Sequence, residues 1–262
     1  MMRNVLTFTN PAFSKMKSSK IKLITLLFSS IIATTHTHTA QAGTPEAVAA
    51  YKAGDYATAF KEFSRQAKRG DAFAQSNLGL MYTNGHGVPQ NYELAMSWFD
   101  KAAEQGDVSA QYCIGVMYHK GQGVAQDFAQ AISWYTKAAD LGHAQAQTNI
   151  GTLHYTGQGF PKDEAKAATW FAKAAEQKHE SAVYNLGVMY KEGRGVSQNS
   201  VIALALFELI AADPASVGAK AKTITAERMS APQIEAAKRL TIELAKPANF
   251  NKAIAAHIKD PK

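Results

Sequence analysis

The chain has 262 residues, of which 28 are lysine or arginine and 21 are aspartate or glutamate, so its formal net charge at pH 7 is +7. Five of the basic residues and none of the acidic ones lie in residues 1–42, which leaves 23 basic against 21 acidic residues in the remainder. This near balance removes the main support for nucleic-acid binding. The single cysteine, Cys113, excludes an internal disulfide, so the fold must be stabilised by packing.

The segment 1–42 has the order of features that is typical of a secretory signal peptide. Basic residues between 15 and 22 precede an apolar run over 23–32, and Ala40 and Ala42 follow at the spacing of a cleavage site. The apolar run is shorter than the ~20 residues that a membrane-spanning helix needs. We therefore expect the protein to be exported to the periplasm, with secretion from the cell as the alternative. After cleavage of the signal peptide we expect no membrane-spanning segment. A retained N-terminal anchor is the competing interpretation.

The next segment, 43–70, predicts a helical hairpin that caps the N-terminal end of the repeats that follow. Gly54 and Asp55 supply its turn. The residues expected to face inward are Ala57, Phe60, Phe63 and Ala67.

A period of 36 residues governs the middle of the chain. The three tryptophans keep this step, and five small-residue positions keep it through four copies: Trp98, Trp134 and Trp170; Ala74, Ala110, Ala146 and Ala182; Gly79, Gly115, Gly151 and Gly187; Gly85, Gly121, Gly157 and Gly193; Gly87, Gly123, Gly159 and Gly195; Ala95, Ala131, Ala167 and Ala203. A fixed period of this length indicates stacked units that cannot bury their apolar faces alone. The sequence predicts four repeats in an all-α solenoid, at 71–106, 107–142, 143–178 and 179–213.

Each repeat predicts a pair of helices. The first helix carries an amphipathic stripe and ends at a glycine suited to a left-handed C-cap, such as Gly85. An Asn or Asp then stands where an N-cap opens the second helix, at Asn91, Asp127, Asp163 and Asn199. The glycine inside the first helix, Gly79 in the first repeat, costs about 1 kcal/mol relative to alanine. We expect it to allow close approach of the neighbouring helix, with Tyr82 and Trp98 closing the gap.

The small-residue pattern ends after Pro214, and the segment 214–262 predicts C-terminal capping helices. Ser230 and Gln233 have the spacing of a capping box with an early proline, and Pro247 is expected to end the helix that follows. This segment carries nine basic and four acidic residues. A solvated capping face is the favoured interpretation, and docking on an acidic partner or membrane surface is the alternative.

The repeat pattern strongly resembles the Sel1-like repeat, a relative of the tetratricopeptide repeat. In the second repeat it is carried by Ala110, Ile114, Gly115, Met117, Tyr118, Gly121, Gly123, Val124, Ala131, Trp134, Tyr135, Lys137, Ala138, Ala139 and Gly142. The resemblance implies antiparallel helix pairs wound into a right-handed α/α superhelix, and a role as an adaptor in signalling, envelope assembly or host contact. Four positions depart from the pattern: His154 at the repeat tyrosine, Phe160 at the loop valine, Lys178 at the closing glycine and Leu206 at the fourth tryptophan.

A cysteine-rich branch of this family has been linked to penicillin binding and β-lactam hydrolysis. That branch relies on paired cysteines, which this chain lacks, and the serine-x-x-lysine element of penicillin-recognising enzymes occurs only within residues 1–42. The remaining histidines show no helical zinc spacing, and the G-x-G loops follow no predicted strand. We therefore predict no catalytic residue, no cofactor and no metal site, and we expect Cys113 to act as a small buried side chain.

The first helices are expected to line the concave side of the solenoid, where a partner could bind. Amides can hold the backbone of an extended peptide, and tyrosines offer apolar area with a polar tip. The predicted partner-binding residues are Tyr112, His119, Thr148, Asn149, Tyr155, Tyr184, Asn185 and Lys191. Local hydrogen bonding to an adjacent loop is the alternative role for the asparagines, including Asn77.

The sequence as a whole predicts an exported interaction scaffold that binds a protein or peptide and no nucleic acid. A hydrolase that acts on β-lactams or the cell wall is the alternative interpretation, and a purely structural envelope-assembly factor is the third. Neither the partner nor the choice between Met1 and Met16 as the start follows from the sequence.

Overall fold

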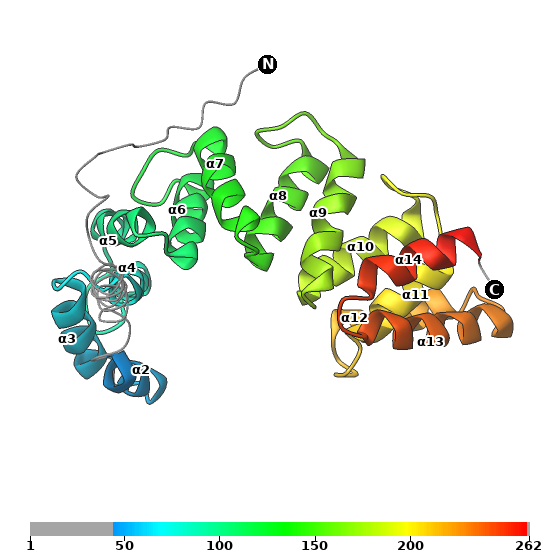
Figure 1. The fold of residues 1–262 in the computed structure, drawn as a ribbon, viewed down its shortest axis with the longest axis horizontal. Helices are drawn as coiled ribbons and strands as arrows, with labels where there is room; N and C mark the ends of the chain where they lie inside the picture. The colour runs from blue at the N-terminus through cyan, green and yellow to red at the C-terminus, as the bar shows by residue number, and fades with distance from the viewer. Residues whose placement is uncertain (1–43, 261–262) are drawn as a thin grey trace, which may run out of the picture.

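The computed structural model describes residues 44–260, and the predicted signal peptide lies outside this range. The described residues form thirteen helices and no strand, arranged as an open, curved stack (Figure 1), which confirms the all-α solenoid. The helices are α2 Thr44–Lys52, α3 Tyr56–Ala67, α4 Ala72–Asn84, α5 Tyr92–Glu104, α6 Val108–Lys120, α7 Phe128–Asp140, α8 Ala144–Thr156, α9 Glu164–Glu176, α10 Glu180–Glu192, α11 Ser200–Leu209, α12 Val217–Ala226, α13 Ala231–Ala245 and α14 Phe250–Lys259.

The helix boundaries follow the predicted capping residues. Each first helix (α4, α6, α8 and α10) ends at a glycine in the left-handed conformation, with φ between 67° and 78°. Each second helix of a repeat begins after an Asn or Asp whose side chain accepts a backbone N–H three residues later. These caps satisfy donors and acceptors that a helix end leaves unpaired. The 36-residue pattern therefore fixes where each helix starts and stops.

The glycine inside each first helix marks a close contact between the two helices of a repeat, as predicted, but the expected rings were wrong. A Cβ on Gly115 would lie 2.6 Å from the Tyr135 ring, and the same conflict exists for Gly79 with Phe99, Gly151 with Phe171 and Gly187 with Phe207. The gap is thus filled by the residue after the tryptophan. The tryptophan is only half-buried, because one helical step of about 100° turns it away from the first helix.

The tryptophans have a different role, because they join one repeat to the preceding layer. Trp134 packs against the cluster formed by α5 and α6, and Trp170 packs against the cluster formed by α7 and α8. A lysine covers the outer face of each ring, with Lys137 Nζ 3.7 Å from the centroid of Trp134. Such a contact combines ring burial with a cation–π attraction. This inter-repeat packing explains why tryptophan keeps the 36-residue step.

The N-terminal hairpin consists of α2 and α3, and α3 packs on α4. Phe63 and Ala67 are buried as predicted and Phe60 is half-buried, but Ala57 is exposed, and Ala59 takes the inward place. The reason is helical geometry. Ala59, Phe63 and Ala67 are four residues apart and share one stripe, whereas Ala57 lies about 200° from Ala59 around the helix.

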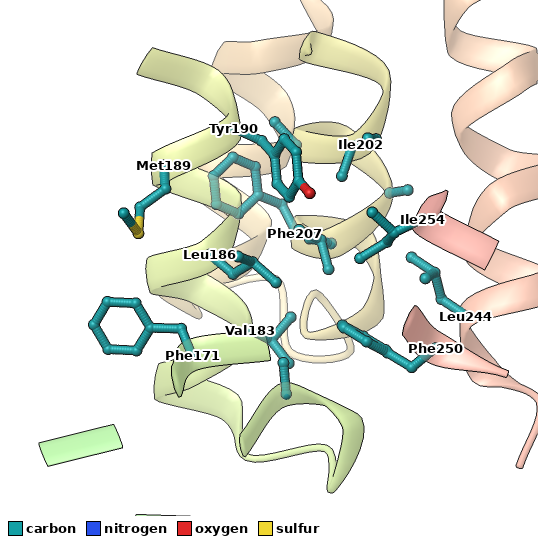
Figure 2. Packing of buried hydrophobic residues seen from close by; sticks show 14 of the residues in the cluster. Phe171, Val183, Leu186, Met189, Tyr190, Ile202, Phe207, Leu244, Phe250 and Ile254 are labelled. Atoms are coloured by element: carbon teal, nitrogen blue, oxygen red, sulfur yellow. The ribbon is translucent and has the colours of Figure 1, made fainter. Parts of the chain in front are cut away.

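The C-terminal helices close the other end of the array. The capping box of Ser230 and Gln233 opens α13, which ends at Ala245 just before Pro247. Phe207 lies between Leu186 of α10 and the C-terminal residues Phe250 and Ile254 (Figure 2). Leu206, at the fourth tryptophan position, is fully buried, because α12 and α13 both pack on α11. None of the helices between residues 44 and 260 combines the length and the apolar character that crossing a bilayer requires.

Candidate functional site

The eight predicted binding residues lie on three consecutive first helices: Tyr112 and His119 on α6, Thr148, Asn149 and Tyr155 on α8, and Tyr184, Asn185 and Lys191 on α10. Seven of them are half-buried, so part of each side chain remains available to a partner. The exception is Thr148, which is only 4% exposed and therefore lies beneath the surface that a partner could contact. We call the exposed side of α4, α6, α8 and α10 the first-helix face.

The centre of the first-helix face is a group of aromatic and amide side chains on α6, α7 and α8. The Tyr112 ring stacks on His143, with ring centroids 4.5 Å apart, and lies 5.9 Å from the Tyr135 ring. Burial raises the pKa of Tyr112 and of Tyr135, and the nearby Asn149 side chain partly offsets this effect. Both hydroxyls therefore stay protonated and can donate hydrogen bonds.

Tyr135 connects this group to His119. Its hydroxyl oxygen lies 3.3 Å from His119 Nδ1, although Tyr135 itself belongs to the second helix α7 and is buried. Burial, followed by the nearby Lys120, lowers the pKa of His119. A neutral ring that accepts from the tyrosine at Nδ1 carries its proton on Nε2. His119 then presents a neutral N–H donor.

A second set of polar contacts joins α8 to the start of α10. Gln145 Nε2 donates to Asn149 Oδ1 at 3.2 Å, and Gln145 Oε1 lies 2.8 Å from His179 Nε2. His179 Nδ1 lies 3.0 Å from the Thr148 hydroxyl, which also lies 2.9 Å from the Ala144 carbonyl. The Thr148 hydroxyl has one proton, which it can donate either to Ala144 or to His179 Nδ1. If it donated to Ala144, His179 would need a proton on both ring nitrogens to keep its contacts with Thr148 and Gln145.

Burial lowers the pKa of His179, with Glu180 opposing it, and lowers the pKa of His143, with His179 adding to the effect. The neutral ring is therefore favoured, with Nε2–H donating to Gln145 and Nδ1 accepting from Thr148. Together these contacts form what we call the polar network, which links three repeats: Tyr112, His119, Tyr135, Gln145, Thr148, Asn149 and His179.

Tyr155 makes a separate contact between repeats. Arg194, from the loop of the fourth repeat, donates to the Tyr155 hydroxyl, and its guanidinium lies 5.8 Å from the ring centroid. Lys162 approaches the same ring at 5.9 Å. Both cations have a carboxylate partner, since Arg194 pairs with Glu192 and Lys162 with Glu164. Tyr155 thus sits in a locally neutralised cluster.

The predicted residues of the fourth repeat do not join the polar network. The Tyr184 ring contacts Phe207 at 5.7 Å. Within residues 44–260, the side chains of Asn185 and Lys191 form no hydrogen bond, and the Lys191 carbonyl accepts one from the Gln198 side chain. The alternative role for the asparagines, bonding to an adjacent loop, does not occur at Asn77, because its amide donates to the Phe73 carbonyl of its own helix.

Sequence reasoning missed three members of the polar network: Tyr135, Gln145 and His179. One signal was available. The ring that fills the glycine gap is Phe99, Tyr135, Phe171 or Phe207, so only the second repeat adds a hydroxyl at this position. The other signal was the replacement of aspartate by His143 and His179 at the first-helix N-cap. His143 still caps α8, at 3.2 Å from the Ala146 N–H, whereas His179 turns to the polar network and makes no side-chain cap.

Formal charge is distributed unevenly between the two kinds of helix. The first helices α4, α6 and α8 contain no Asp or Glu, and Lys120 is their only Lys or Arg. The second helices α5, α7 and α9 carry both acidic and basic residues in each case. The first-helix face of the first three repeats is therefore built mainly from uncharged polar and aromatic groups.

Potential metal ligands do not cluster in the part of the chain that the structure describes. Burial, followed by the nearby Asp107, raises the pKa of Cys113 to about 12, which keeps it a thiol near neutral pH. We expected a buried side chain, but Cys113 is half-buried, because its side of α6 lies next to the exposed first-helix face.

Comparison with known proteins identifies the repeat. A model of the Sel1 repeat matches residues 72–107, 108–143, 144–179 and 180–213. No curated protein sequence matches the chain.

Among solved structures, a Sel1 repeat protein from Oxalobacter formigenes is 37% identical over 62% of this chain and 48% of that one, with a TM-score of 0.57. The protective antigen c5321 of uropathogenic Escherichia coli, which has the same repeat fold, is 28% identical over 78% of this chain and 59% of that one, with a TM-score of 0.41. This chain thus spans about half the length of the Oxalobacter protein. With four matched repeats over more than half of its residues, the chain belongs to the Sel1 repeat family.

Proposed function

We propose that the protein is an exported scaffold that binds a protein or peptide partner on its first-helix face and catalyses no reaction. Sel1 repeat proteins are generally protein–protein interaction scaffolds, and this fold leaves a long row of helices exposed to partners. The observation that carries the proposal is the polar network, which holds half-buried Tyr112, His119 and Asn149 in fixed positions. Ordered side chains of this kind lose little entropy when a partner binds.

Site-specific photocrosslinking in cells tests the binding surface. A photoreactive phenylalanine analogue at Asn185 or Val116 would report on the first-helix face, and the same analogue at Ser133 would report on the outer side of α7. Adducts specific to the first-helix positions support the proposal, and mass spectrometry then identifies the partner. Equal crosslinking from Ser133, or none from any position, would contradict it.

Export and the absence of catalysis need their own measurements. N-terminal sequencing of the protein recovered from the producing cells should find a chain that begins near residue 43, in the periplasmic or secreted fraction. Purified protein should leave a chromogenic cephalosporin intact. Turnover that disappears when one residue of the polar network is replaced would instead support the hydrolase.

A further inference from the structure

We propose that the first-helix face across the second and third repeats holds an extended, uncharged peptide segment of the partner, mainly through the backbone of that segment. This inference rests on the proposed scaffold function and deepens it by naming the chemistry of the segment.

The charge distribution argues for an uncharged segment. The polar network contains amides, hydroxyls and histidines whose pKa values are lowered, and the helices α6 and α8 that carry most of it contain no carboxylate and only Lys120 as a permanent cation. A charged side chain that enters such a surface loses water without gaining a counterion. An uncharged segment avoids that cost.

The hydrogen-bonding groups argue for recognition of peptide backbone. Tyr112 supplies a protonated hydroxyl, His119 supplies a neutral N–H, and Asn149 supplies an amide with both donor and acceptor atoms. Peptide groups alternate one N–H with one C=O, so a row of neutral donors and acceptors matches them. Internal contacts already fix these three side chains, which reduces the ordering cost of binding.

Apolar area lies beside these groups. The Tyr112 ring is fixed against His143, and Val116, one helical turn after Tyr112 on α6, is half-buried. Aromatic rings that present a polar tip can cover a segment while hydrogen-bonding to it. The partner segment is therefore expected to combine small or apolar side chains with few charges.

A library of random 12-residue peptides displayed on phage provides the probe, because the partner is unidentified. Panning on the exported chain, from residue 43 to the end, should enrich peptides that are poor in Asp, Glu, Lys and Arg. Their dissociation constants, measured by fluorescence polarisation, should change less than about twofold when the salt concentration rises from roughly 50 to 500 mM. Enriched peptides that carry a net charge and lose about tenfold in affinity over that range would overturn the inference.

Three variants locate the binding site. Asn149→Leu should weaken the enriched peptides about tenfold, and Tyr112→Phe, which keeps the ring, should weaken them roughly threefold to tenfold through one lost hydrogen bond. Asn77→Leu is the matched control, because Asn77 holds the same place in the first repeat but bonds its own helix, and binding should be unchanged. Circular dichroism confirms that each variant is folded.

The outcomes separate this inference from the proposed function. Enriched peptides that bind Asn149→Leu as tightly as the native chain would overturn the inference while leaving a scaffold that binds elsewhere. A native chain that enriches no peptide and forms no photocrosslink from its first helices would overturn both.

Discussion

The His154 ring stacks on the Phe160 ring, with centroids 4.0 Å apart and planes 9° from parallel. These are the two positions of the third repeat that depart from the tyrosine and valine of the other repeats. The imidazole is 7% exposed, and its Nδ1 has no hydrogen-bond partner within the described residues. Two departures from the repeat pattern are thus one structural unit, in which a smaller buried ring is covered by a larger loop side chain.

A double-mutant cycle tests this coupling. His154→Tyr should be destabilising alone because the larger ring meets Phe160, and Phe160→Val should be destabilising alone because it uncovers the imidazole. The double variant restores the pattern of the second repeat and should recover most of the loss, with a coupling energy of about 1 kcal/mol or more. Urea unfolding gives all four free energies. Additive effects would show that the two substitutions are independent.

A second prediction concerns glutamine pairs that link the start of the first helix of a repeat to the end of its second helix. Gln105 Nε2 donates to Gln75 Oε1 at 2.8 Å, and Gln177 Nε2 donates to Gln147 Oε1 at 2.9 Å. The equivalent pair in the middle is broken, because Leu141 stands in place of the donor. Gln111 is 8% exposed and its Oε1 has no partner within residues 44–260, while Leu141 is 61% exposed.

Leu141→Gln should therefore raise the free energy of unfolding by about 1 kcal/mol, the net value of a typical hydrogen bond. The matched control is Gln105→Leu, which creates the same defect one repeat earlier and should cost about as much or more, because it leaves a buried acceptor unpaired. Chemical denaturation measures both. A neutral Leu141→Gln with a destabilising Gln105→Leu would mean that water already satisfies Gln111.

The glycine gap supplies a third prediction. Alanine is the better helix former by about 1 kcal/mol, so Gly151→Ala would stabilise an open helix. Here its Cβ would lie 2.8 Å from the Phe171 ring, which is fully packed. We expect a net loss of about 1–3 kcal/mol from overpacking, and a larger loss for Gly151→Leu. Thermal unfolding at or above the native midpoint would refute the close-approach account.

The sequence predicted the fold well because the features that define it are local and repeated. Caps such as Asn91 and Gly85 act within one or two helical turns, so a single chain reveals them. The ring in the glycine gap was missed because Trp98 and Phe99 are adjacent, and the choice between them depends on how α5 is rotated against α4. Periodicity identifies both residues without fixing that rotation.

The polar network was predicted in part for a related reason. Tyr112, His119, Thr148 and Asn149 lie on first helices, where counting along the period finds them. Tyr135 joins the polar network from a second helix, through the space that Gly115 leaves open, and His179 joins it from a capping position. The place of Tyr135 depends on how the two helices of one repeat pack, and that of His179 depends on a contact between repeats. The period alone specifies neither.

The histidines predict how stability depends on pH. Burial is the largest cause that lowers the pKa of five histidines below the ordinary value of 6.5: His119, His143, His154, His179 and His257. Above pH 6.5 both the folded and unfolded chains leave these rings neutral. As the pH falls below 6.5, the unfolded chain binds protons that the folded chain resists, so the free energy of unfolding should decrease until the lower folded-state pKa values are reached.

Urea unfolding at intervals between pH 7.5 and pH 5 measures this slope, and a variant with His143→Asn and His179→Asn tests its origin. The variant removes two of the five groups, and asparagine can still cap the helices that these residues precede. Its stability should therefore fall less steeply below pH 6.5 than that of the native chain. An unchanged slope would place the acid sensitivity elsewhere, whereas a flat native profile would mean that the five rings take up protons equally in the folded and unfolded states.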